Sequence, residues 1–246
     1  MASRKPGTVH HERRLLEECL RAGIPCHRAD TLKLKAFIRS FGTLGKTDAI
    51  DAAKLAAYGR ERWAILALWA EPESHQQQLQ ALVRRRSELV ALKVAEQNRA
   101  KAPGAKALAS SFKAMLAAIG RQIEAIEAAI AELIAQSPAL RARIAVLTAM
   151  HGIGQRSAAA LLAAMPELGT LTRRQAAALA GLAPHPNDSG LAKGYQRMRG
   201  GRAEVRTTLF LPALRAAGGK GEFAAFYKRL IANGKKPIVA VAAVMR

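Results

Sequence analysis

Apolar residues recur at three- and four-residue steps along most of the chain, which is the spacing of one face of an α-helix. The longest such pattern covers residues 74–135, and Ala102-Pro103-Gly104 interrupts it. A break of this composition divides the pattern into two predicted helices. Two apolar stripes joined in this way predict a helical hairpin that forms a coiled-coil-like arm, whose simplest role is dimerisation or spacing.

Shorter patterns precede the arm. Helices are expected over residues 12–22, from an N-cap at Thr31, and from Asp48 to about Tyr58, with a short strand over residues 24–27. This helix–strand–helix order is what the second half of an α/β domain contains.

After the arm the pattern predicts further helices and one long loop. The expected helices cover 144–182, 203–217, 222–232 and 238–245, and the loop over 183–203 is rich in Pro, Gly and basic residues. These patterns predict three domains, namely a partial α/β domain over 1–70, the helical arm over 71–138, and a helical domain over 139–246.

Composition supports a mainly α fold. Half of the residues are hydrophobic and only 4% are aromatic, and Ala and Leu dominate, which favours helix-on-helix packing. No uninterrupted apolar run of about 18 residues occurs, so we expect no membrane span. No apolar stretch follows the basic amino end, so no signal peptide is expected either.

The charge changes the functional picture. Lys and Arg number 39 against 18 acidic residues, which gives a net charge of +21, with the greatest excess over residues 147–246. Such a chain attracts polyanions because binding phosphates releases condensed counterions. DNA or RNA is therefore the expected partner, and the alternative is a ribosome-associated or merely soluble basic protein. Cys19 and Cys26 show no metal spacing and no disulfide framework, which fits a reducing cytoplasm.

Asp48 and Asp51 are the first candidate site residues. Their spacing of three places the two carboxylates near one face of a helix, where oxygen ligands can share a hard cation such as Mg²⁺. The alternative is an ordinary helix start, in which Thr47 or Asp48 caps the helix and Asp51 complements its dipole.

Gly152 and Gly154 form the second candidate. They lie in the segment His151-Gly152-Ile153-Gly154 between two helical patterns, an arrangement similar to a helix-hairpin-helix motif. Its glycines allow backbone amides to approach a DNA phosphate, and the next helix N-terminus favours the anion. The alternative is an ordinary turn between helices.

Ser189 is the third candidate. It lies in the Pro- and Gly-rich loop just before a dense basic run formed by Lys193, Arg197, Arg199 and Arg202. A serine hydroxyl can attack a phosphodiester when arginines neutralise the developing charge. The alternative is a turn serine beside solvated cations, since the sequence shows no general base.

The order and spacing of these features resemble the transposases of the insertion sequence 110 family, over roughly residues 12–246. The resemblance rests on the ordered segments Lys46-Thr47-Asp48-Ala49-Ile50-Asp51-Ala52, Gly152-Ile153-Gly154, Ala180-Gly181-Leu182-Ala183-Pro184, Ser189-Gly190 and Lys235-Lys236-Pro237.

The resemblance implies a RuvC-like (RNase H-like) domain, a coiled-coil arm and a helical transposase domain with a helix-hairpin-helix. In this family four acidic residues hold a divalent metal such as Mg²⁺, and a serine attacks DNA. Asp48 and Asp51 match the last two acidic residues, and Ser189 matches the serine. The resemblance also implies a structured guide RNA as partner and a homo-oligomer that joins the acidic site to the serine.

Two of the four acidic residues have no match. Nothing corresponds to the first aspartate, and Pro6 falls near the position of the glutamate, with Thr8 as the remaining matching residue. We therefore expect a copy shortened at its amino end, and the abrupt stop at Arg246 suggests a shortened carboxyl end. The hypotheses are a DNA transposase, active or inactive, and a non-catalytic nucleic-acid-binding remnant. A small-molecule enzyme has little support, because no dinucleotide fingerprint or P-loop is present.

Overall fold

The computed structural model describes residues 9–42, 45, 47–71, 73–186, 194 and 197–246, with only the backbone of 9–12. The chain divides into two compact units, Met1–Pro72 and Glu73–Arg246, which are described one at a time. The protein is mainly helical, which confirms the predicted fold class at that level. No helix in the described part is both long enough and apolar enough to cross a membrane.

The first unit consists of helices α1 (Val9–Arg21), α2 (Thr31–Ser40) and α3 (Asp48–Arg62) and the 3₁₀ turn η1 (Trp63–Ile65). The prediction of a strand over 24–27 is wrong, because the described residues of this unit form no strand ladder. Among the described residues, a backbone hydrogen bond from the Trp69 amide to the Cys26 carbonyl, at 2.7 Å, joins this segment to a distant one. The RuvC-like character of this unit stays a prediction.

Helices α2 and α3 pack through aromatic rings. Phe37 and Tyr58 are buried, and the Phe37 ring meets the rings of Phe41 and Tyr58 edge-on at centroid distances of 5.1 and 5.2 Å. Asp30, rather than Thr31, caps α2, and its carboxylate accepts two backbone amides at 2.8 and 3.0 Å. The predicted helix start was therefore one residue late.

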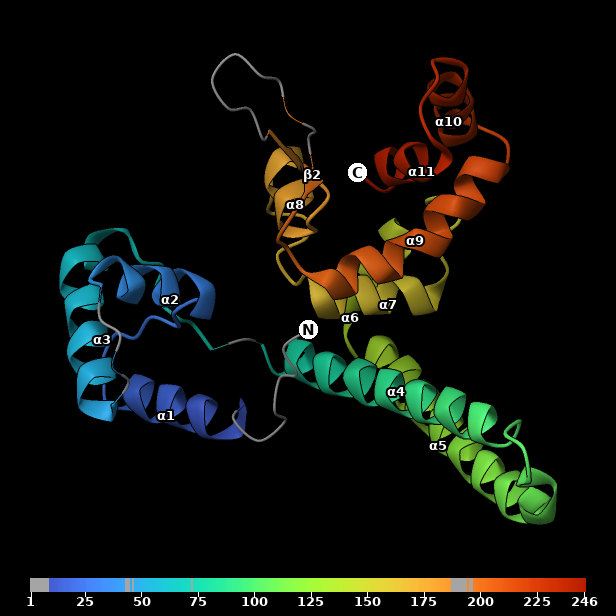
Figure 1. The fold of residues 1–246 in the computed structure, drawn as a ribbon, viewed down its shortest axis with the longest axis horizontal. Helices are drawn as coiled ribbons and strands as arrows, with labels where there is room; N and C mark the ends of the chain where they lie inside the picture. Colours follow the sequence, from blue (N-terminus) through green and yellow to red (C-terminus); the bar gives the residue numbers. More distant parts are fainter. Residues whose placement is uncertain (1–8, 43–44, 46, 72, 187–193, 195–196) are drawn as a thin grey trace. The chain divides into compact units, whose positions relative to one another are not determined.

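The predicted hairpin arm is present in the second unit. Helices α4 (Ser74–Arg99) and α5 (Ala109–Gln136) lie side by side (Figure 1). A turn with a 3₁₀ segment, η2 (Ala105–Leu108), joins them. Gly104 adopts a φ of +81° in this turn, a left-handed conformation that glycine adopts without steric cost.

Helix α7 (Gln155–Ala164) is the centre of this unit, and it follows α6 (Pro138–Thr148). Leu162 faces a core shared with the arm, whereas Leu161 faces a second core on the other side of the helix. Helix α7 therefore has apolar residues on more than one face, and a helix with this pattern is buried between other elements. The first core contains Leu79, Ile130, Leu133, Ile134, Leu140, Ile144, Ala158, Ala159, Leu162 and Ala163.

An ion-pair network joins the arm to α7. Glu127 of α5 accepts from Arg86 of α4 at 2.7 Å and from Arg156 of α7 at 2.8 Å. The shared core and this network make the arm a continuation of the helical domain rather than a loosely tethered segment.

The remaining elements are α8 (Arg173–Leu179), strands β1 (Pro184–His185) and β2 (Arg197–Met198), and helices α9 (Ala203–Gly218), α10 (Glu222–Ala232) and α11 (Pro237–Met245). The three last helices agree with their predicted ranges within about one residue. Helix α9 lies across α7 (Figure 1). The predicted loop over 183–203 contains a short antiparallel strand pair, which sequence patterning missed because each strand has only two residues.

Candidate nucleic-acid interface

The strand pair β1–β2 fixes the base of the connection that carries the candidate serine. Ser189 and Lys193 lie outside the described residues, and both fall between the two strands in the sequence. The strands pair antiparallel, with His185 opposite Arg197. The connection therefore begins and ends at this strand pair, which is called the hairpin base.

Two glycines bring the backbone together next to this base. Gly181 precedes β1 and Gly201 follows β2, with φ angles of +69° and +64°. A Cβ on Gly201 would overlap the backbone N and Cα of Gly181 and lie 2.7 Å from the Leu179 carbonyl oxygen. The Arg202 amide also donates to that carbonyl at 2.8 Å. The two ends of the hairpin are thus held in direct backbone contact.

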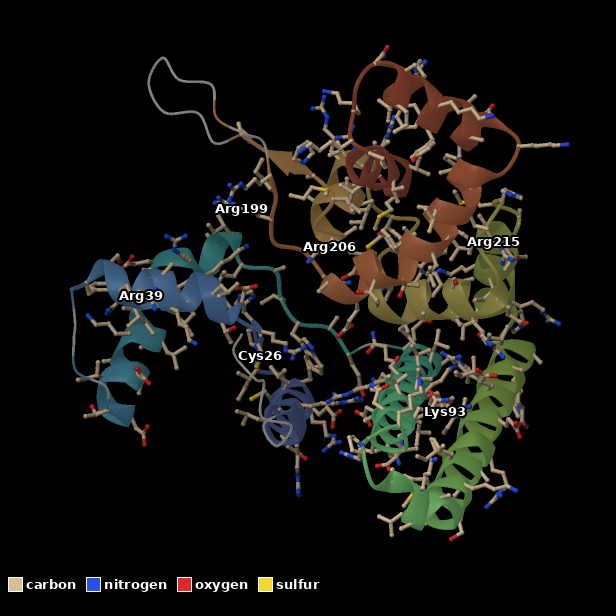
Figure 2. All side chains as sticks on the ribbon, turned by 45° about the vertical axis from the view of Figure 1, so that its right-hand side comes forward. Cys26, Arg39, Lys93, Arg199, Arg206 and Arg215 are labelled. Atoms are coloured by element: carbon tan, nitrogen blue, oxygen red, sulfur yellow. The ribbon has the colours of Figure 1, made fainter. Side chains whose placement is uncertain are left out.

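Arg206, from the first half of α9, closes the same junction (Figure 2). Its Nη1 donates to the Gly200 carbonyl at 2.6 Å and to the Ala180 carbonyl at 3.4 Å. One guanidinium therefore links the segment after β2 to the turn before β1, and fixes both relative to α9.

Arg202, predicted to contact DNA, makes bonds within the protein. Its Nη1 and Nη2 each lie 2.7 Å from a carboxylate oxygen of Glu167, and Nη1 also donates to the Ala164 carbonyl at 2.8 Å. This fork-to-fork geometry ties the start of α9 to the segment that follows α7. The DNA-binding role of Arg202 stays a prediction, and these bonds give the residue a structural role.

Glu167 was missed by sequence reasoning. The only available signal is its isolation, since few acidic residues interrupt the basic segment 147–246. The hydrogen bond from Arg202 lowers the pKa of the Glu167 carboxyl below its ordinary value, although partial burial acts in the opposite direction.

The Glu167–Arg202 pair predicts an acid-sensitive contribution to stability. Because the native carboxyl has the lowered pKa, its contribution is present above the ordinary glutamate pKa and is lost as pH falls through the native value. Both side chains are exposed by more than a third, at 40% and 36%, so we expect at most about 1 kcal/mol. Urea unfolding followed by circular dichroism should give wild type a larger free energy of unfolding than Glu167→Gln near neutral pH. This difference should close as the pH is lowered. An equal gap at every pH would contradict the assignment.

Gly152 and Gly154 are used differently. Gly152 has a φ of +94°, and a Cβ there would lie 2.7 Å from the Pro212 carbonyl oxygen of α9. The close approach of α9 is therefore a sufficient reason for a glycine at position 152. Gly154 caps α7 with extended dihedrals and has no side-chain cap, and a Cβ on it would meet nothing within 4 Å. Of the two, Gly154 is the one at an open surface, where a phosphate can approach the first amides of α7.

Asp48 and Asp51 lie in the first turn of α3, and Thr47 is its N-cap, with Oγ1 accepting the Ile50 amide at 3.2 Å. The helix-start interpretation therefore describes their local geometry, with both carboxylates near the positive end of the helix dipole. Among the described residues, no group of three or more His, Cys, Asp or Glu is placed to hold a metal ion. The two aspartates alone do not fit a complete Mg²⁺ site.

Exposed cations without a carboxylate partner surround the hairpin and the carboxyl-terminal helices. In the part of the chain that the structure describes, no acidic side chain forms an ion pair with Arg173, Arg174, Arg197, Arg199, Arg215, Lys220, Lys228, Arg229, Lys235 or Lys236. Arg199 follows β2, and Arg215 lies in the last turns of α9 (Figure 2). Uncompensated cations of this kind are available to phosphates.

Comparison with known proteins identifies relatives for both units. Residues 144–228 match a family model described as "Transposase IS116/IS110/IS902 family", and residues 7–103 match a second model, of the DEDD type of IS110 transposase. The chain is 29% identical over 219 residues to a pilin gene-inverting protein of Moraxella bovis, over 87% of this chain and 67% of the relative. The corresponding protein of Moraxella lacunata matches to the same extent.

A third relative is the "Insertion element IS110 uncharacterized 43.6 kDa protein" of Streptomyces coelicolor, which is 34% identical over 128 residues, 51% of this chain and 30% of that protein. The two family models cover the segment with Asp48 and Asp51 and the segment with the glycine turn and the hairpin base, in the predicted order. The chain belongs to the IS110 family of transposases.

Proposed function

We propose that this chain acts in RNA-guided DNA transposition, with Ser189 as the nucleophile. The observation that carries the proposal is the hairpin base, which is held between Gly181 and Gly201 and bordered by cations without carboxylate partners. A fixed base with free cations beside it suits a loop that must present one hydroxyl to a polyanionic backbone.

In this proposal the Ser189 hydroxyl attacks a DNA phosphorus atom and displaces a deoxyribose oxygen. Arg197 and Arg199 are exposed at and beside β2, close in sequence to the serine. Cations so placed would neutralise the charge that develops on the phosphate oxygens. Gly154 and the first amides of α7 would hold a second phosphate by a contact that reads no sequence.

The partners in this proposal are DNA, a structured guide RNA and further copies of the chain, in the cytoplasm. Asp48 and Asp51 would supply part of an acidic site for a divalent metal such as Mg²⁺. Because these two carboxylates do not complete a site among the described residues, we assign no step to the metal. An oligomer would bring the acidic segment of one copy to the serine of another.

The test of the interface is the salt dependence of DNA binding. Affinity for a duplex should fall steeply as salt rises, because counterions are released from the phosphates. Arg197→Ala and Arg199→Ala should each weaken binding for all sequences alike and reduce the log–log salt slope by about 1. The measurement is a fluorescence anisotropy titration at several salt concentrations.

Lys113→Ala is the matched control, because this exposed lysine lies on α5 of the arm. It should leave affinity and slope close to those of the wild type. If the affinity for DNA does not change with salt, or if Lys113→Ala loses as much affinity as the arginine variants, the hairpin is not the contact.

A second candidate function is nucleic-acid binding without catalysis. The specific observation in its favour is that Asp48 and Asp51 have no third acidic partner among the described residues. Binding needs only the cations and the open start of α7, whereas strand exchange needs a complete acidic site. A chain that binds DNA and guide RNA, yet exchanges no strands even as a mixed oligomer with a longer relative, would establish this alternative.

A further inference from the structure

The carboxyl end of α7 receives side chains from other elements. The last carbonyls of a helix have no partner within the helix and need donors from elsewhere. Gln76, in the first turn of α4, donates from Nε2 to the Leu162 carbonyl at 2.8 Å. Arg202, the residue before α9, donates to the Ala164 carbonyl at 2.8 Å. The arm and the segment next to the hairpin base therefore bond to carbonyls that are two residues apart.

A further side chain comes from α6. Arg143 donates from Nη2 to two carbonyls of the stretch that follows α7, at 2.7 and 2.9 Å. Glu167 in the same stretch accepts hydrogen bonds from both terminal nitrogens of Arg202. Residues 162–168, which we call the α7 end segment, therefore connect α4, α6 and the start of α9.

Gln76 is an unusual residue for a core position. Its side chain is 6% exposed, and among the described residues its Oε1 has no hydrogen-bond partner. A buried acceptor without a partner lowers stability. Leu79, one helical turn further along α4, is the apolar kind of residue that this core otherwise contains. A residue that breaks a local rule in this way is expected at a functional position, and what the amide supplies here is the donor to Leu162.

The α7 end segment is connected to the hairpin base through Arg202. The Arg202 side chain bonds to this segment, while its amide donates to the Leu179 carbonyl at 2.8 Å. The preceding residue, Gly201, lies against the backbone of Gly181. A displacement of the α7 end segment would therefore move the residue that joins the two ends of the hairpin.

We propose that Gln76 is a positioning residue for the hairpin base, and that it acts through the α7 end segment and Arg202. This inference rests on the proposed function in so far as the hairpin carries the nucleophile. Gln76 lies where the chain enters α4 from the first unit, the unit that contains Asp48 and Asp51. The contact connects the start of the arm to the hairpin base, and Gln76 itself touches no reacting atom.

The first experiment measures hydrogen exchange by mass spectrometry in Gln76→Met, a side chain of similar length without the donor. Amides of residues 179–185 and 197–202 should exchange about two- to ten-fold faster, the effect of losing one hydrogen bond on a local opening. The urea midpoint should stay close to that of wild type, because removal of the unpartnered Oε1 offsets the lost bond. Gln80→Met is the matched control, because Gln80 is an exposed glutamine of the same helix.

Gln80→Met should change neither quantity, and Gln76→Leu, a second apolar variant, should repeat the result of Gln76→Met. Unchanged hydrogen exchange around the hairpin base would overturn the proposal. Global unfolding of both apolar variants would also overturn it, because Gln76 would then be required for the fold as a whole.

A double-mutant cycle tests the route through Arg202. Arg202→Met removes the bonds to the α7 end segment, so adding Gln76→Met to it should produce no further increase in hydrogen exchange at residues 197–202. Coupled positions are non-additive, whereas independent positions add. Increases that add would show that the two residues act separately, which contradicts the proposed route.

Strand exchange by the chain with its guide RNA separates this proposal from the proposed function. Gln76→Met should lower turnover by up to about a hundredfold, because a misplacement of about 1 Å has an effect of this order, and should leave the affinity for DNA unchanged. An unchanged turnover would overturn the positioning role. Wild type that exchanges no strands would contradict the proposed function alone, since the hydrogen-exchange measurements still decide whether Gln76 positions the hairpin base.

Discussion

Ser189→Ala is expected to abolish DNA strand exchange while leaving DNA binding intact. The hydroxyl is the only group that the substitution removes, and in the proposed function this hydroxyl forms the bond to phosphorus. Loss of a nucleophile that acts as part of a catalytic unit lowers turnover by at least about a thousand-fold. In the same proposal binding depends on cations such as Arg197 and Arg199, and the substitution leaves these in place.

The measurement is formation of exchanged DNA products by the chain with its guide RNA, alone or assembled with a longer relative. Anisotropy titration of the same preparation measures binding. Ser111→Ala is the control, because Ser111 is an exposed serine near the start of α5 and should leave both quantities unchanged. A Ser189→Ala protein that still exchanges strands would remove Ser189 from the mechanism.

Gly201→Ala is expected to have the largest effect on the fold of the hairpin base. The residue needs a φ of +64°, which costs a residue with a Cβ about 1–2 kcal/mol. Its Cβ would also overlap the backbone of Gly181, and backbone cannot move aside as a side chain can. Overpacking adds about 1–3 kcal/mol, so the free energy of unfolding should fall by about 2–5 kcal/mol in total.

Gly200→Ala supplies the matched control for Gly201→Ala. Gly200 has a similar φ of +71°, but a Cβ there would meet no atom within 4 Å. It should therefore show only the conformational cost of about 1–2 kcal/mol. Urea unfolding followed by circular dichroism compares the two variants. Equal losses of stability would mean that the contact with Gly181 contributes nothing, and that the conformation alone requires glycine.

The sequence predicted the helices well because their signals are local. Residues three and four apart share a helix face, so the periodicity of residues 74–135 reports the arm without any knowledge of its neighbours. The same holds for the start of α3 at Asp48 and for the break at Gly104. The strand expected over residues 24–27 failed because a strand exists only when a second segment pairs with it.

The candidate site was predicted in part. The order of the motifs identified the family, and the model matches on both units confirm it. The glycine of the turn at Gly152 was assigned to phosphate binding, but the close approach of Pro212 is a sufficient reason for it. Arg202 was assigned to DNA binding because it lies in a basic run. That position carries no information about the distant carboxylate of Glu167, to which Arg202 donates.

Periodicity, charge and motif order by themselves determined the helical class, the arm and the family of this protein, because each of these signals depends on residues that are close together in the sequence. Only the tertiary structure decided that Glu167 holds Arg202, that Gly201 touches Gly181 and that α9 covers Gly152. These contacts join residues that are far apart in the chain. A pair of this kind is selected by packing in three dimensions, and a single sequence has no local pattern that records it.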